Sequence, residues 1–82
     1  MSTVSYLRSA LIRAEKRLGK YEARRDELQA RLVKDPNARN SKALQNLEAD
    51  PSYQAAKDAV VNLTAALARE ESRLYANPSA AL

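Results

Sequence analysis

Apolar residues recur at alternating steps of three and four over two long stretches of this chain, and this spacing constrains the fold more than any other feature. The first stretch comprises Val4, Leu7, Leu11, Ala14, Leu18, Tyr21, Arg25, Leu28 and Leu32. The second comprises Tyr53, Ala56, Val60, Leu63, Leu67, Glu70 and Leu74. This spacing places side chains on one face of a helix and is typical of coiled-coil packing. The sequence therefore predicts an all-α fold in which two helices pack along these faces.

Three prolines, each preceded by Asp or Asn, divide the chain at Pro36, Pro51 and Pro78. The residue before a proline is disfavoured in the α region, while proline itself fits the first turn of a helix. Each site therefore ends one segment and can begin the next. We expect one domain over residues 1–82, divided into helix 3–33, a middle segment 35–49, helix 51–76 and a tail 77–82.

The middle segment, residues 35–49, carries only a weak apolar face. It could form a short third helix capped by Asp35, which would fold over Val60 and Val61 and shield the first turns of the second long helix. The alternative is a mobile loop. We favour the helix, because the second long helix begins too far from the first for a tight turn to join them.

Each apolar series contains one charged residue, Arg25 in the first and Glu70 in the second. In an antiparallel hairpin these two misfits could face each other, and the same alignment would set Tyr21 against Leu74. A buried ion pair adds little net stability but can fix the register of two helices. We therefore predict that Arg25 and Glu70 pair inside the seam. The alternative is that Arg25 binds an anion or an acidic partner.

In this alignment the start of the first helix extends beyond the end of the second, with Gly19 at the junction. The extension, residues 3–18, would leave an apolar stripe in water, although burying one leucine is worth roughly 1.5–3 kcal/mol. We therefore expect it to be an interaction site that assembles the hairpin into a multi-chain helical bundle. The predicted interaction residues are Val4, Leu7, Leu11, Ile12 and Leu18.

Gly19 is the only glycine of the chain and lies inside a predicted helix. Glycine costs about 1 kcal/mol there relative to alanine. It could allow a close approach of Tyr75, permit a bend, or simply be tolerated at an exposed position.

Positive charge is concentrated in the first helix. Residues 1–34 contain nine Lys and Arg and four Asp and Glu, whereas residues 51–82 contain three of each kind. A basic stripe at helical spacing is formed by Arg13, Lys16, Arg17, Lys20 and Arg24. Such a stripe can contact phosphates or an acidic protein surface, but it is more often a solvated helix face.

The composition argues against catalysis and metal binding. The chain has no histidine and no cysteine, so Ser-His and Cys-His nucleophile systems and the usual transition-metal ligands are missing. One glycine cannot supply a glycine-rich phosphate loop. We expect no enzyme activity, no catalytic residue, no metal site and no cofactor.

No apolar run approaches the length of a membrane span or a signal-peptide core. We expect no membrane partner and a cytoplasmic location, or a virion location if the protein is of phage origin.

An 82-residue chain without disulfides or metals buries too little surface for a robust core of its own. We therefore expect a non-enzymatic protein–protein interaction or assembly module, such as a phage or bacterial accessory protein. Its partner would be a second copy of itself or a larger protein assembly. The alternative is a hairpin that binds RNA or DNA through the basic stripe.

Overall fold

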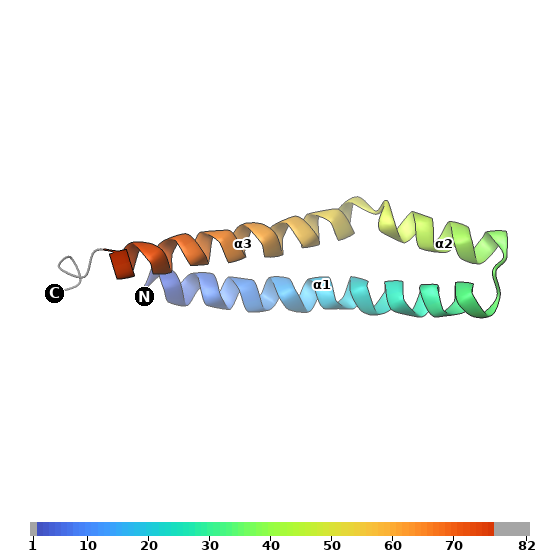
Figure 1. Ribbon diagram of the computed structural model, residues 1–82, viewed down its shortest axis with the longest axis horizontal. Coiled ribbons are helices and arrows are strands. Elements are labelled where there is room, and N and C mark those ends of the chain that lie inside the picture. The colour runs from blue at the N-terminus through green and yellow to red at the C-terminus, as the bar shows by residue number, and fades with distance from the viewer. Residues whose placement is uncertain (1, 77–82) are drawn as a thin grey trace.

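The computed structural model describes residues 2–76 and contains three helices (Figure 1). Helix α1 spans Thr3–Lys34, helix α2 spans Ala38–Glu48 and helix α3 spans Pro51–Ala76. The all-α prediction and the bounds of both long helices agree with these spans. The middle segment forms a helix, as favoured above, and the predicted tail, residues 77–82, lies outside the described residues.

Side chains next to the predicted breaks cap the helices. The Ser2 hydroxyl accepts a hydrogen bond from the Ser5 amide at the start of α1, at 3.1 Å. The Asp50 carboxylate accepts one from the Ser52 amide at the start of α3, at 2.8 Å. These bonds satisfy amides that have no partner within the helix.

The cap of α2 differs from the prediction. Asn37, and not Asp35, occupies the N-cap position, and its side-chain oxygen accepts a hydrogen bond from the Asn40 amide at 2.8 Å. The Asn40 side chain in turn donates to the Asp35 carbonyl oxygen at 2.8 Å. Pro36 stands between the two and separates the end of α1 from the cap of α2. The turn between α1 and α2 is therefore very short.

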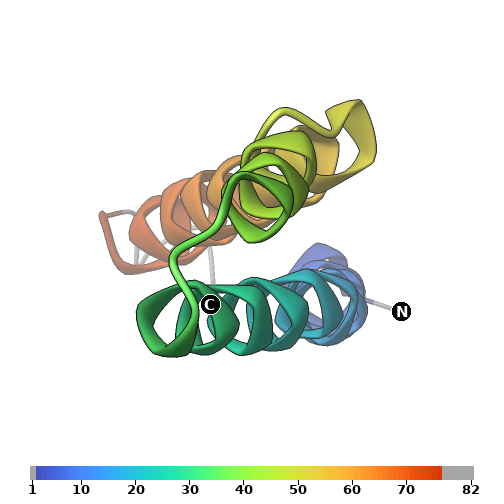
Figure 2. The same cartoon turned by 90° about the vertical axis from the view of Figure 1, so that its right-hand side faces the viewer.

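The molecule is a rod of two layers. Helix α1 forms one layer, and α2 and α3 follow each other along the other layer (Figure 2). The rod measures 62 × 20 × 20 Å, and its radius of gyration is 18.4 Å. A compact chain of this length would have a radius of gyration of about 12 Å. The extended shape leaves little room for an interior.

The register of the hairpin differs from the predicted one. Tyr21 lies against Tyr53, where the predicted alignment set it against Leu74. The difference between positions 53 and 74 is 21 residues, which is three heptads. At the other end Arg8 reaches Glu71, and the start of α1 lies beside the end of α3 (Figure 1). The prediction that residues 3–18 extend beyond the hairpin is therefore wrong.

Helix α2 occupies the place that the predicted register gave to the end of α3. It lies along the last part of α1 (Figure 1). Leu28 is buried there. The prediction that this helix covers Val60 and Val61 is wrong: Val61 remains 65% exposed. The short turn explains the difference, because it sends the chain straight back along α1.

The predicted seam of α1 is nevertheless the face that the other helices cover. All nine of its positions are buried or half-buried, and Ala10 is the one further α1 residue that is not exposed. Full burial is rare: within the described residues it is reached by Leu28, Tyr53 and Ala56 only. The spacing therefore predicts correctly which face of α1 is covered, while the seam stays accessible from both sides.

Candidate interaction surfaces

Arg25 and Glu70, the predicted register pair, do not meet. The Arg25 guanidinium lies 3.9 Å from Asp26, its neighbour in sequence, and its Nε is buried without a hydrogen-bond partner among the described residues. Glu70 instead accepts a hydrogen bond from Arg73 on its own helix. The pairing prediction is therefore wrong, because the register places Glu70 beside the beginning of α1 rather than its middle.

The Arg73–Glu70 contact is local and exposed on the Arg73 side. The hydrogen bond to Glu70, and then the charge of that carboxylate, raise the pKa of Arg73 above its usual value. Surface ion pairs of this kind contribute little to stability. The pair reduces the free positive charge on α3 by engaging Arg73. Arg69 is the other arginine of this helix.

The predicted interaction residues at the start of α1 divide into two groups. Val4, Leu7, Leu11 and Leu18 are half-buried, because α3 lies beside them. Ile12 points away from the seam and is 58% exposed. The apolar stripe is thus partly covered within the chain, and Ile12 is the member that is still available to a partner.

An aromatic cluster joins α1 to the start of α3. The rings of Tyr21 and Tyr53 stack, and the Lys57 ammonium lies 4.2 Å from the centre of the Tyr53 ring. Tyr53 is fully buried, yet its hydroxyl has no hydrogen-bond partner among the described residues. The Gln54 side chain adds a tie to the end of α2 by donating to the Glu48 carbonyl oxygen at 2.7 Å. This cluster therefore contains the one large side chain of the described residues that is fully buried.

One side of the hairpin, which we call the Arg8 side, carries both signs of charge. Arg8 and Glu71 approach to 3.6 Å across the two helices. At steps of seven residues from Arg8 and Glu71, the same side carries Glu15, Glu22, Lys57 and Thr64. Exposed apolar side chains lie next to them on the same helix faces: Ile12, Val61 and Tyr75.

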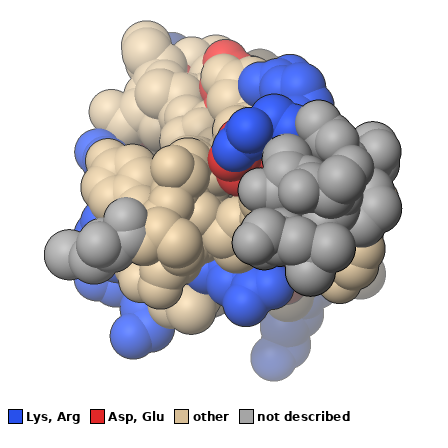
Figure 3. All heavy atoms as spheres, turned by 90° about the vertical axis from the view of Figure 1, so that its left-hand side faces the viewer, with Lys and Arg blue, Asp and Glu red and all other residues tan. Residues whose placement is uncertain are grey.

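The Arg8 side also contains a groove at the end of the rod. The groove has a volume of about 340 Å³ and is lined by Ser2, Val4, Arg8, Glu71, Leu74 and Tyr75. Tyr75 is 83% exposed and Leu74 47%. Figure 3 views this end of the rod and shows extensive uncharged surface, with acidic atoms visible in few places.

The opposite side holds a second groove, which we call the alanine groove. It has a volume of about 190 Å³ and is lined by Arg13, Ala14, Arg17, Ala55, Ala56 and Ala59. Four alanines form its apolar surface and two arginines flank it, so no acidic residue lines it. The sequence prediction placed Ala14 and Ala56 in the seam and missed Ala55 and Ala59. Ala55 and Ala59 directly precede the seam residues Ala56 and Val60, and this spacing is the signal that could have identified them.

The five residues of the predicted basic stripe are all exposed, and two of them, Arg13 and Arg17, line the alanine groove. Arg24 forms an ion pair with Glu27 at 3.2 Å. Within residues 2–76, the other four make no ion pair with an acidic side chain. At the end of the rod, Lys and Arg are prominent along the α1 edge (Figure 3).

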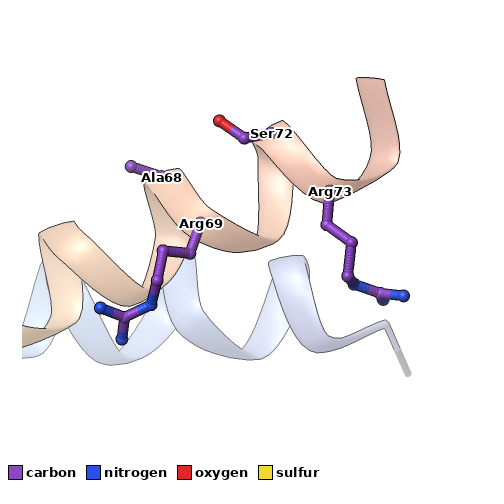
Figure 4. A pocket seen from close by; sticks show the side chains of 4 residues that line it. All are labelled: Ala68, Arg69, Ser72 and Arg73. Atoms are coloured by element: carbon purple, nitrogen blue, oxygen red, sulfur yellow. The ribbon is translucent and has the colours of Figure 1, made fainter. Parts of the chain in front are cut away.

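A shallow hollow on α3 is lined by Ala68, Arg69, Ser72 and Arg73. Figure 4 shows Arg69 and Arg73 projecting to one side of the helix and Ala68 and Ser72 to the other. The hollow is therefore open helix surface between two differently oriented rows of side chains. It does not gather groups for catalysis.

Among residues 2–76, no group of three or more potential metal ligands is close enough to hold a metal ion. No helix in the same range has the length and hydropathy required to cross a bilayer. Comparisons with models of protein families, with curated proteins and with solved structures find no match to this chain.

Proposed function

We propose that this chain is a non-enzymatic protein–protein interaction module that covers the Arg8 side of its apolar seam with a second copy of itself. The observation that carries the proposal is the incomplete burial of the seam. Only three side chains of the described residues are buried, whereas most seam residues keep access to water.

The total surface supports the same proposal. The chain exposes 6311 Å². A compact monomer of its mass would expose about 4,900 Å². The excess, about 1,400 Å², exceeds the roughly 800 Å² that each partner buries in a typical stable complex. The chain therefore exposes enough surface for such a contact.

The Arg8 side fits a second copy better than the opposite side. It combines exposed apolar side chains, Ile12 and Val61, with both acidic and basic residues. A two-fold contact brings one patch against itself, so a patch with both signs of charge can pair with its own copy. The basic alanine groove would instead place arginine against arginine.

The experiment is sedimentation of the unmodified protein and of two matched variants at micromolar concentration. We expect the unmodified protein to sediment as an oligomer, and Ile12→Glu with Val61→Glu to sediment as a helical monomer. The control, Ala23→Glu with Ala30→Glu, adds the same charge at exposed positions outside the patch. A monomeric unmodified protein would contradict the proposal.

One observation favours a second candidate function, the binding of nucleic acid. The basic stripe is exposed along its whole length, and the net charge of the chain is +4. Four unpaired cations on phosphates would make log K fall with log salt at a slope of about −3 to −4. A DNA or RNA titration at several salt concentrations tests this candidate, and no binding at about 50 mM salt would exclude it.

A further inference from the structure

The alanine groove is formed mainly by short side chains. Its apolar part consists of alanine side chains from both long helices: Ala14, Ala55, Ala56 and Ala59. Half-buried Ala10 and Ala66 lie seven residues from Arg17 and Ala59 and extend the same side toward the free end of the rod. Short side chains let a third helix approach closely, and packed helix axes lie 8–10 Å apart.

The charge around the groove specifies what that helix must carry. Arg13 and Arg17 line the groove, and Lys16 and Lys20 stand beside them, all without an acidic partner among the described residues. On α3, Arg69 and Arg73 continue the row of alanines at steps of three and four, although Arg73 already donates a hydrogen bond to Glu70. Figure 4 shows these two arginines projecting to the same side of α3. A partner helix must therefore be acidic.

Two other occupants fit this side less well. A second copy would bring the same arginines together, and like charges oppose association. Nucleic acid would neutralise the cations but would leave the alanine surface unused. Single strands also bind by stacking bases on exposed aromatic rings, and no aromatic residue lines the groove.

We propose that the alanine groove binds an acidic amphipathic helix of another protein. The helix lays small apolar residues on the alanines, and its carboxylates accept hydrogen bonds from Arg13 and Arg17. Arginine suits this role, because its guanidinium binds a carboxylate through two parallel hydrogen bonds. The inference rests on the proposed function as an interaction module, but it uses the side of the hairpin opposite the Arg8 side.

The test is a fluorescence anisotropy titration with defined probes. The first probe is a labelled peptide of about three heptads, with alanine and leucine on one helical face and glutamate on the other. The second has lysine in place of glutamate, and the third is a single-stranded DNA of similar length. We expect saturable binding of the acidic peptide, a rise in its helicity by circular dichroism, and no binding of the basic peptide.

Two variants separate shape from charge. Ala59→Trp fills the groove without changing the charge, and Arg13→Gln with Arg17→Gln removes two charges and leaves the alanines. We expect each to weaken peptide binding by roughly tenfold or more. The control, Lys34→Gln with Lys42→Gln, removes two exposed charges elsewhere and should change the affinity less than about twofold.

The outcomes that overturn the inference are distinct from failure of the proposed function. Tighter binding of the DNA than of the acidic peptide, with a steep salt dependence, would assign the side to nucleic acid. Unchanged peptide affinity in the Arg13→Gln, Arg17→Gln variant, or no peptide binding at all, would also refute it. Sedimentation of the same samples reports self-association independently. An oligomer that does not bind the acidic peptide would therefore refute this inference and leave the proposed self-association standing.

Discussion

The ring of Tyr21 in α1 stacks on the ring of Tyr53 in α3, with the ring centres 5.5 Å apart and the planes 9° from parallel. Stacked aromatic pairs contribute about 0.5–1.5 kcal/mol beyond the burial of their surface. The pair also sets the register, because a shift of one heptad would put Tyr21 against a much smaller or differently shaped neighbour.

Tyr53→Ala should lower the free energy of unfolding by about 3–5 kcal/mol, because it removes the one large side chain of the described residues that is fully buried. Tyr53→Phe is the matched control. It keeps the ring and removes a buried hydroxyl that has no partner, so stability should stay the same or rise. Urea unfolding followed by circular dichroism measures both. A large loss in the phenylalanine variant would show that the hydroxyl is hydrogen-bonded in solution.

Arg25→Leu and Glu70→Leu should have additive effects on stability, because these residues do not touch. Their coupling energy in a double-mutant cycle should stay within about 0.3–0.5 kcal/mol of zero. Arg73→Leu with Glu70→Leu is the matched pair in which a contact does exist. A coupling energy for Arg25 and Glu70 well above that of the local pair would indicate a slipped hairpin.

Gly19→Ala should raise the free energy of unfolding by about 1 kcal/mol, which is the difference in helix propensity. Apart from its chain neighbours and the backbone of its own helix, a Cβ added at Gly19 would meet no atom of the described residues within 4 Å, so the suggestion that glycine permits a close approach is wrong. The reverse change at an exposed position of the same helix, Ala23→Gly, should cost a similar amount. A destabilising Gly19→Ala would point to a partner that covers this position.

Asn37→Ala should cost about 1 kcal/mol, because it removes the side-chain cap of α2. Asp35→Ala should have little effect, since Asp35 takes part through its backbone carbonyl and amide. Thermal unfolding of the two variants side by side measures the difference. A larger loss of stability in Asp35→Ala than in Asn37→Ala would support Asp35 as the cap of α2, as the sequence pattern suggested.

The helices were predictable because local rules decide them. Proline with a preceding Asp or Asn sets the breaks, and the seam residues of α1 follow the three-four spacing closely enough that Arg25, too, is half-buried. The register was not predictable on the same grounds. A heptad pattern repeats every seven residues, so shifts by whole heptads preserve the apolar match.

The apparent match of Arg25 with Glu70 led to a predicted register that is wrong by three heptads. What decides the register is the three-residue connection between Lys34 and Ala38, which returns the chain along α1 at once, together with the Tyr21–Tyr53 stack. Neither follows from the spacing of apolar residues. The alanine groove escaped prediction for a related reason: alanine carries a weak hydropathy signal, and the groove forms only where α1 and α3 face each other in this register.

The most direct test of the register is a pair of distances measured by spin labels in the otherwise cysteine-free chain. The label pairs are Ser9→Cys with Ser72→Cys and Ala23→Cys with Ser72→Cys, all at exposed positions. In the register described above, the first pair lies close to level along the rod, while the second is offset by about 21 Å more, because Ser9 and Ala23 are 14 residues apart at 1.5 Å per residue. We therefore predict a short distance for the first pair and a long one for the second, in samples diluted with unlabelled protein. A short distance for the second pair and a longer one for the first would contradict this register and restore the slipped hairpin.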